Sequence, residues 1–322
     1  MKFVHCAVSL MLAISGSAAL AQTSKYPSRT VRMLVGFSPG GATDIIARLI
    51  SPGLTESLEQ SVVVENRPGA SSQIAGEFVA KSAPVGHTLL MVTQTLMTSQ
   101  MIEKRTYPDL TKDFAAVALC ATSPLVLVVN PSLPVRSLKE LIALARARPG
   151  EMNYGSGGVG TTPHLSGELF ATMARLKLVH IPYKGEGPAI VDVLAGHLPF
   201  MFTNVTASSA QVQSGKMRAL AVTGPQRAPA VPGVPTLAES GLPGFEVVGF
   251  FGVMASVATP RELVAQLNAE IGKVLARPDI RERFASQALD PGNRTAEQFG
   301  DYLKSEAVKW GKLIREAGIT AK

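Results

Sequence analysis

The chain has 322 residues, 46% of them hydrophobic and 17% charged, with a formal net charge of +7. This length is sufficient for two hydrophobic cores or one large α/β unit. Nucleic-acid binding is not expected, because basic residues are mixed with acidic ones, as in Arg281-Glu282-Arg283, and no basic run with interleaved aromatic residues occurs.

The N-terminus has the pattern of a secretory signal peptide. Lys2 precedes an apolar run from Phe3 to Leu20, and Ala19-Leu20-Ala21 supplies an A-x-A cleavage site. The sequence therefore predicts that residues 1–21 are removed and that the mature protein is periplasmic. An uncleaved membrane anchor is the alternative, and no later stretch is long and apolar enough to span a bilayer.

Of the two cysteines, Cys6 lies in this leader and Cys120 in the mature chain. A single thiol cannot form an internal disulfide. The exported protein is therefore expected to be stabilised by its hydrophobic core.

A strand, a glycine turn and a helix are predicted in succession at the start of the mature chain. They are Thr30–Val35, Gly36–Gly41 and Ile45–Leu58, and Thr43 or Asp44 is expected to cap the helix. The free N–H groups and the positive dipole end of a helix N-terminus suit an anion. This junction is therefore a candidate anion-binding loop.

Strands and helices continue to alternate, which predicts mostly parallel sheets flanked by helices. The next elements are the strands Val62–Glu65 and Thr88–Val92 and the helix Ile74–Ser82. Residues 93–113 are polar and irregular and predict a loop with a helical turn. The apolar run Phe114–Val129 is too long for one ordinary strand, so we interpret it as a strand that leaves one domain and enters another.

The second region repeats the alternation. Its predicted helices are 137–148, which begins with the capping box Ser137 to Glu140, Leu165–Arg175 and Ala189–Ala195. One predicted strand of this region ends at Tyr154, and three more cover Val179–Pro182, Leu198–Phe202 and Ala219–Val222. After a segment rich in Pro and Gly, the strand Glu246–Ala255 and three helices, from Thr259-Pro260, over Pro278–Gln287 and over Ala296–Ala317, complete the chain.

This order predicts two α/β domains with a hinge and a cleft between them. Residues 22–120 and 224–322 are expected to form the discontinuous domain 1, and residues 121–223 domain 2. The second domain is then about a hundred residues long, which is an ordinary domain size.

Gly36-Phe37-Ser38-Pro39-Gly40 matches G-x-S-x-G, the nucleophile elbow of serine hydrolases, in the strand–turn–helix context that the motif requires. Pro39 argues against catalysis, because the residue after the serine normally donates its backbone N–H to the oxyanion and proline has none. A hydrolase that uses Ser38 with His164 or His87 therefore remains the alternative to a binding protein.

Gly155-Ser156-Gly157-Gly158-Val159-Gly160 contains the dinucleotide fingerprint G-x-G-x-x-G. The acid expected at the end of the next strand is missing from Val179–Pro182, so no nucleotide cofactor is predicted. The glycines still allow the backbone to approach a small anion, and Thr161 and Thr162 add hydroxyl donors at a helix start.

No two histidines of the mature chain are spaced as zinc ligands, so no metal site is predicted. His164, on the first turn after the second glycine loop, is a candidate ligand contact or a packed structural histidine. Tyr183 and Lys184 follow one strand and Asn204 follows another, so each is a candidate contact, with a surface or turn role as the alternative.

Five segments together resemble the Bug-type substrate-binding proteins of tripartite tricarboxylate transporters, over nearly the whole mature chain. They are Phe37–Asp44, Glu65–Ala70, Tyr154–Thr161, His180–Gly185 and Val234–Glu239. The resemblance implies a two-domain periplasmic-binding-protein fold of the Venus-flytrap type, type II-like. It also implies that two glycine loops, here Gly40–Asp44 and Ser156–Thr162, hold a ligand carboxylate.

The ligand-binding residues expected on these grounds are Ser38, Gly40, Gly41, Ala42, Thr43, Asp44, Ser156, Gly158, Gly160, Thr161, Thr162, His164, Tyr183, Lys184 and Asn204. The resemblance further implies a monomeric, non-enzymatic receptor that delivers a small carboxylate to small and large membrane transport subunits. A receptor that signals to a membrane sensor is an alternative within the same fold.

The chain departs from the family pattern at three places. It has Gly69-Ala70-Ser71-Ser72 where Gly-Ala-Gly-Gly is common, and Phe250 where a Trp is frequent. It also has Phe202-Thr203-Asn204 where Phe-Asp-Asn is common. If that acid holds an amine in amino-acid-binding members, its absence here disfavours a zwitterionic ligand.

Overall fold

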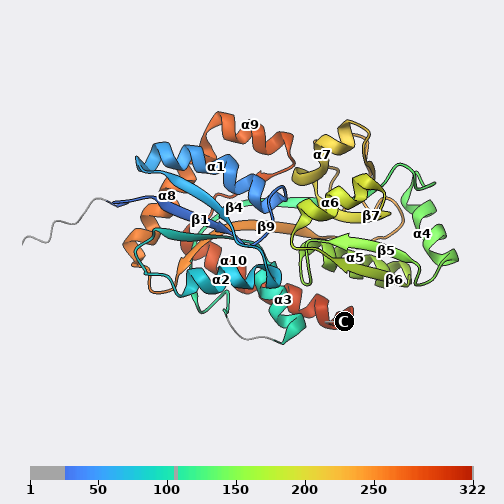
Figure 1. Cartoon of the computed structure of the whole chain (residues 1–322), viewed down its shortest axis with the longest axis horizontal. Coiled ribbons are helices and arrows are strands. Elements are labelled where there is room, and N and C mark those ends of the chain that lie inside the picture. The colour runs from blue at the N-terminus through green and yellow to red at the C-terminus, as the bar shows by residue number, and fades with distance from the viewer. Residues whose placement is uncertain (1–25, 105–107, 321–322) are drawn as a thin grey trace, which may run out of the picture.

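A computed structural model describes residues 26–104 and 108–320, so the predicted leader lies outside the described residues. The described chain forms two lobes that share one mixed sheet, with helices on both of its faces (Figure 1). The sheet order is β2-β1-β3-β9-β4-β7-β5-β6, and β8 and β10 also pair with β4. The two-domain α/β fold expected from the sequence is confirmed.

Lobe 1 contains the first strand–helix junction and both chain ends of the described region. Its strands are β1 (Val31–Val35), β2 (Val62–Asn66), β3 (Thr88–Val92), β9 (Val248–Ser256), β10 (Asp290–Pro291) and the first part of β4 (Phe114–Val129). Its helices are α1 (Ala42–Leu58), the 3-10 turn η1 (Ala70–Ser72), α2 (Gln73–Ala80), α3 (Thr95–Glu103), α8 (Arg261–Ala276), α9 (Pro278–Ser286) and α10 (Ala296–Glu316). The strands β1, β2 and β3 are parallel, and β9 is antiparallel to β3.

Lobe 2 contains the second glycine loop. Its strands are the last part of β4, β5 (Met152–Ser156), β6 (Leu178–Pro182), β7 (Phe200–Asn204) and β8 (Arg218–Val222). Its helices are α4 (Leu138–Ala147), α5 (Thr162–Ala174), α6 (Glu186–Ala195) and α7 (Val205–Gln213). The strands β5, β6 and β7 are parallel, whereas β7 and β8 are antiparallel to β4.

The strand β4 passes through both lobes. As far as Pro124 it pairs with β9, and from Leu125 onward it pairs with β7 and β8. This pairing supports the interpretation of residues 114–129 as a strand that leaves one domain and enters another.

The return path of the chain differs from the expected boundary at residue 224. The backbone N–H of Leu237 donates to the carbonyl of Val222 at 2.9 Å, and that of Val247 donates to Thr223 at 3.0 Å. Phe245 stacks on Phe202 in lobe 2, with ring centroids 6.2 Å apart. Because this segment packs on β8, we propose that lobe 2 extends to about residue 247 and that the second crossing lies at the start of β9.

Two helices were missed in the sequence. The segment after β3, predicted as a loop with a helical turn, contains the full helix α3, and α7 follows β7 directly. All six residues from Thr95 to Gln100 are buried, so α3 has no exposed polar face to produce a helical periodicity. This omission matters, because both helices begin at the boundary between the lobes.

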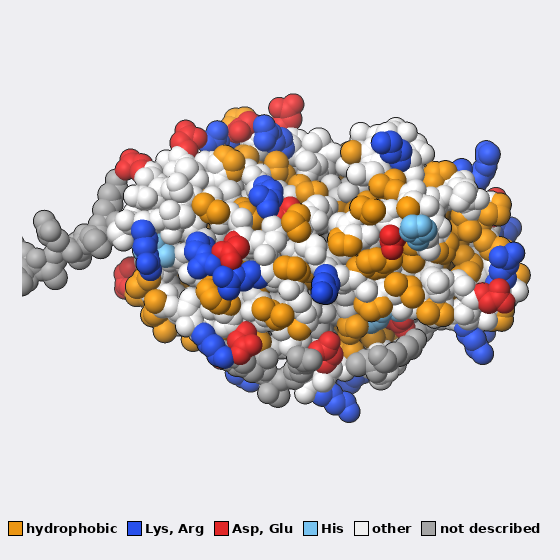
Figure 2. All heavy atoms as spheres, viewed as in Figure 1, with side chains coloured by type: hydrophobic (Ala, Val, Ile, Leu, Met, Phe, Trp, Pro, Cys, Tyr) orange, Lys and Arg blue, Asp and Glu red, His pale blue; other side chains and the backbone are white. Residues whose placement is uncertain are grey.

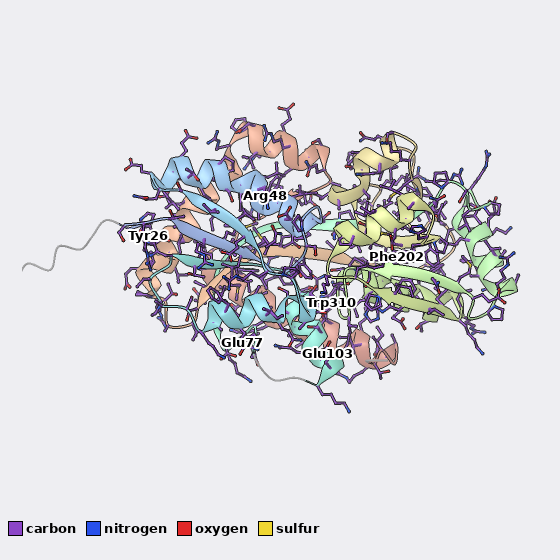
Figure 3. All side chains as sticks on the ribbon, in the orientation of Figure 1. Tyr26, Arg48, Glu77, Glu103, Phe202 and Trp310 are labelled. Carbon is purple, nitrogen blue, oxygen red and sulfur yellow. The ribbon has the colours of Figure 1, made fainter. Side chains whose placement is uncertain are left out.

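The core lies on both faces of the sheet. One face packs against α1, α6, α7, α8 and α9, and the other against α2, α3, α4, α5 and α10. Figure 3 places Phe202 in lobe 2 and Trp310 on α10 beneath the sheet, and both side chains are buried. None of the helices in the described part of the chain is both long and apolar enough to cross a membrane.

Candidate functional site

A small cavity lies between the lobes at the point where several helices begin. Its volume is about 30 Å³, which is space for about two water molecules. Five helices begin at its wall: Ala42 of α1, Thr95 of α3, Thr162 of α5, Glu186 of α6 and Asn204, the N-cap of α7.

Helix N-termini give this cavity its chemistry. The first turn of each helix has N–H groups without an intrahelical acceptor, and the helix dipole is positive at that end. Where five such ends meet at one cavity, their partial charges add. The arrangement therefore favours a small anion over a cation or an apolar ligand.

The lobes contact each other around the cavity. The backbone N–H of Ser38 donates to the carbonyl of Lys184 at 2.9 Å. A Cβ on Gly187 would lie 2.3 Å from the carbonyl oxygen of Pro39, so only glycine permits this approach. The described conformation is therefore closed.

The first glycine loop contributes three of its expected residues to the cavity wall, namely Gly41, Ala42 and Thr43. Ser38 and Gly40 lie at the contact between the lobes instead. Gly40 has a φ of +88°, and a Cβ there would meet the Cα of Gly187 at 3.8 Å.

Asp44 lies below this loop rather than at the cavity. Its carboxylate accepts from the Gly40 N–H at 3.2 Å, from Arg48 Nε at 3.0 Å and from Asn66 Nδ2 at 2.9 Å. Burial alone raises the pKa of Asp44, but these hydrogen bonds together lower it below its ordinary value. The residue that precedes α1 is Gly41, with no side-chain cap, so the expected capping by Thr43 or Asp44 is wrong. Figure 3 shows Arg48 on α1.

The second glycine loop places Thr161 and Thr162 at the cavity, together with Gly157, which was not among the expected contacts. Thr161 is the N-cap of α5, and its hydroxyl accepts from the backbone N–H of His164 at 3.4 Å. Its hydroxyl also donates to the carbonyl of Gly158 at 2.7 Å, which holds the loop against the helix start.

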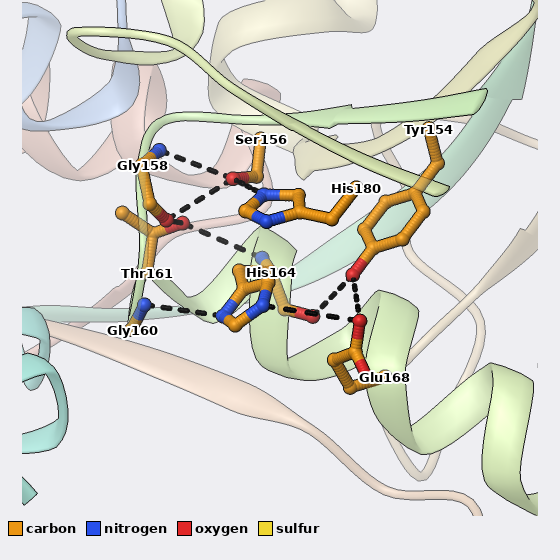
Figure 4. Close-up of polar contacts among 8 residues, drawn as sticks. All are labelled: Tyr154, Ser156, Gly158, Gly160, Thr161, His164, Glu168 and His180. Atoms are coloured by element: carbon orange, nitrogen blue, oxygen red, sulfur yellow. Dashed lines mark hydrogen bonds and ion pairs between the residues drawn. The ribbon is translucent and has the colours of Figure 1, made fainter. Parts of the chain in front are cut away.

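The remaining expected residues of this loop, Ser156, Gly158 and Gly160, do not line the cavity, and Figure 4 shows their polar contacts within lobe 2. Ser156 Oγ is 2.6 Å from His180 Nε2 and accepts from the Gly158 N–H at 3.1 Å. The N–H of Gly160 donates to His164 Nδ1 at 3.1 Å. These contacts support the loop from the side opposite to the cavity.

His164 belongs to a polar cluster inside lobe 2. Its ring lies 4.0 Å from that of His180, and the hydroxyl of Tyr154 donates to Glu168 Oε1 at 2.7 Å (Figure 4). His164 lines a separate pocket on lobe 2, together with Glu168 and His180, and not the cavity between the lobes. The structure thus places it in a supporting position.

Tyr183 and Lys184 are also outside the cavity wall. The hydroxyl of Tyr183 donates to Asp192 Oδ2 at 2.5 Å, and the side chain of Lys184 is exposed. Lys184 acts through its backbone carbonyl, which receives the hydrogen bond from Ser38.

Asn204 lines the cavity, as expected, and is accompanied by an acid that sequence reasoning missed. Asn204 Nδ2 donates to Glu186 Oε1, while Thr203 Oγ1 and the Asn204 N–H donate to Glu186 Oε2 at 3.2 and 3.3 Å. Burial raises the pKa of Glu186 to about 7, although these hydrogen bonds lower it. We expected α6 to begin at Ala189, which left Glu186 in a loop; an acid directly after Gly185 is the helix-start signal that could have found it.

The other unexpected residues of the wall are Thr93 and Thr95 at the start of α3, Pro163 on α5, and the aromatic residues Phe37, Phe250 and Phe251. The two threonines were missed because the segment after β3 was predicted as a loop with a helical turn. Within the described residues, no group of His, Cys, Asp or Glu is arranged to hold a metal ion.

Two α/β lobes that close on a cavity lined by helix N-termini define a two-lobed ligand-binding protein. The chain belongs to the tripartite tricarboxylate transporter family receptors, whose family model matches residues 46–319. The resemblance seen in the glycine loops is thereby confirmed.

Known proteins support the same assignment. The chain is 37% identical over 318 residues to protein BugT from Bordetella pertussis, covering 98% of this chain and 97% of the relative. A structure of Rhodopseudomonas palustris Rpa4515 with adipate has a TM-score of 0.89 at 36% identity, covering 92% of this chain and 99% of that one. A structure of MatC from Rhodopseudomonas palustris with bound malate has a TM-score of 0.86 at 29% identity, covering 90% and 100%.

Proposed function

We propose that this receptor captures a small carboxylate in the cavity between its lobes, in the periplasm, and delivers it as a monomer to a tripartite tricarboxylate-type membrane transporter. The observation that carries the proposal is the convergence of five helix N-termini on one closed cavity. Two similar structures contain bound adipate and bound malate, which are small carboxylates.

The ligand contacts that we propose are Gly41, Ala42, Thr43, Thr161, Thr162 and Asn204. The other expected residues hold the loops or join the lobes: Ser38, Gly40, Asp44, Ser156, Gly158, Gly160, His164, Tyr183 and Lys184. Hydrogen bonds to a charged group contribute about 1.5–3 kcal/mol each. Three or four of them, less the cost of ordering and closure, correspond to roughly micromolar affinity, about 8 kcal/mol.

Closure provides the signal for delivery. A ligand that contacts both lobes favours the closed state by its differential contacts, and a membrane partner can recognise that state. Transport subunits and a membrane sensor would both recognise it, so uptake must be measured directly. Membrane vesicles that contain the transport subunits should accumulate labelled ligand only when the receptor is added.

Binding itself is tested on freshly exported protein. Native mass spectrometry should detect a retained small acid, and calorimetry with mono-, di- and tricarboxylates should give a dissociation constant of about 1 μM for at least one of them. The mass of the mature chain should lack residues 1–21. No binding across this panel would contradict the proposal.

The serine-hydrolase alternative has little structural support. His164 is bonded to Gly160, and His87 Nδ1 is 2.7 Å from the Val85 carbonyl. Among the described hydrogen bonds, none joins Ser38 to an imidazole. We expect Ser38→Ala to retain ligand binding, whereas under the alternative it would remove an esterase activity.

A further inference from the structure

The cavity also contains hydrogen-bond acceptors, which a plain carboxylate cannot satisfy. Asn204 is only 5% exposed, and its Oδ1 has no hydrogen-bond partner in the described structure. Glu186 lines the same cavity, with both carboxylate oxygens beside Asn204 and Thr203.

The orientation of Asn204 is determined by its neighbour. Its Nδ2 donates to Glu186 Oε1, and a flipped amide would place Oδ1 against that carboxylate oxygen instead. Oδ1 is therefore left without a donor. A buried acceptor without a partner costs about 1–3 kcal/mol, so a ligand group that donates to it removes this cost on binding.

The position of Glu186 also bears on an expectation from the sequence. Thr203 stands where related proteins commonly have an acid, and its absence was expected to disfavour a zwitterionic ligand. In the structure, Thr203 Oγ1 donates to Glu186 Oε2 at 3.2 Å, so a carboxylate from the start of α6 lies beside Thr203.

We propose that the ligand of this cavity is a carboxylate that also bears a hydroxyl or amino group, and that Glu186 and Asn204 Oδ1 accept hydrogen bonds from that group. This inference rests on the proposed carboxylate-binding function. The helix N-termini hold the anionic end, and the two acceptors select the donor. Above about pH 7, where Glu186 is ionised, a plain diacid would instead bring its second carboxylate towards a charge of the same sign, and the two would repel.

Calorimetry on the wild-type receptor with two matched series tests the inference. The series are succinate, malate and aspartate, and adipate, 2-hydroxyadipate and 2-aminoadipate. We expect the donor-bearing acids of the series that fits the cavity to bind about tenfold or more tightly than the plain diacid. Comparison of the hydroxy acid with the amino acid identifies the donor.

Glu186→Gln then tests the residue. We expect it to reduce the preference for the donor-bearing acid to about twofold, and to tighten binding of the plain diacid because the repulsion is removed. Glu282→Gln, an exposed exchange on α9, is the matched control and should preserve the wild-type preference.

The outcomes separate the two proposals. Equal affinity for plain and donor-bearing acids in the wild-type receptor, or an unchanged preference in Glu186→Gln, overturns the role of the acceptors while leaving the carboxylate receptor intact. Failure of the wild-type receptor to bind any acid contradicts the carboxylate receptor itself. The wild-type comparison decides the inference even if the variant does not fold.

Discussion

The hydroxyl of Thr98 on α3 lies 2.6 Å from the carbonyl oxygen of Gly160 in the second glycine loop, and donates to it across the boundary between the lobes. The same hydroxyl is 3.0 Å from the carbonyl of Gln94 within its own helix, so the shorter contact is the one between lobes. A helix that the sequence analysis missed is thus part of the closed state. On the face seen in Figure 2, basic side chains are interspersed with acidic and apolar ones.

Removal of this hydrogen bond should weaken ligand binding. Thr98→Val keeps the side-chain shape but loses the donor, which destabilises the closed state by about 1 kcal/mol and lowers affinity roughly fivefold. Thr172→Val, on an exposed position of α5, is the control. Equal affinities of both variants in calorimetry would show that the contact does not contribute to closure.

Gly160→Ala should block closure. Gly160 has a φ of +76°, and a Cβ there would lie 2.5 Å from the Ser99 backbone of the other lobe. Gly150 has a similar φ of +82°, but a Cβ there would meet no atom within 4 Å. Gly150→Ala therefore introduces the same backbone strain without the clash. Both variants should lose about 1 kcal/mol of stability.

Only Gly160→Ala should also lose about tenfold or more in ligand affinity. Its radius of gyration in small-angle X-ray scattering should exceed that of Gly150→Ala, because the lobes stay apart. If both variants bind ligand equally well, the placement of Gly160 at the closing contact is wrong.

Stability should depend on pH through Glu186. Its pKa is raised from 4.5 to about 7 in the folded state. Between these values the folded state retains a proton that the unfolded state has released, so the free energy of unfolding falls as pH rises and levels off above about 7. Glu186→Gln lacks this loss. The free energy of unfolding of Glu186→Gln should therefore rise relative to that of the wild type from about pH 5 to pH 8, by up to about 3 kcal/mol. Melting temperatures of both proteins across this pH range measure the difference. A difference that stays constant over this range would refute the assignment.

Cys120 should be unreactive in the folded protein. The thiol is fully buried in β4, and burial raises its pKa to about 12, so almost no thiolate forms at neutral pH. A chromogenic disulfide reagent should label the exported protein only in denaturant, with one thiol per chain. Two thiols per chain would mean that Cys6 and the leader are retained.

Local patterns explain what could be predicted. The bounds of β3 and β4 match the prediction because both strands are largely apolar, and β4 is interrupted only at Thr122-Ser123-Pro124. Ser137 accepts from the Glu140 N–H at 3.2 Å, as the capping motif indicates. The predicted start of α1 was late by three residues, because Gly41 precedes the helix without a side-chain cap.

The sequence by itself determined the two lobes, the strand that crosses between them and the two glycine loops, because strand periodicity and turn residues act over a few neighbouring positions. Only the tertiary structure decided which loop residues face the cavity, that α3 and α7 begin there, and that the Glu186 carboxylate lies beside Thr203. Those facts depend on which distant segments meet when the lobes close, and burial against another lobe leaves no periodic signal in the chain.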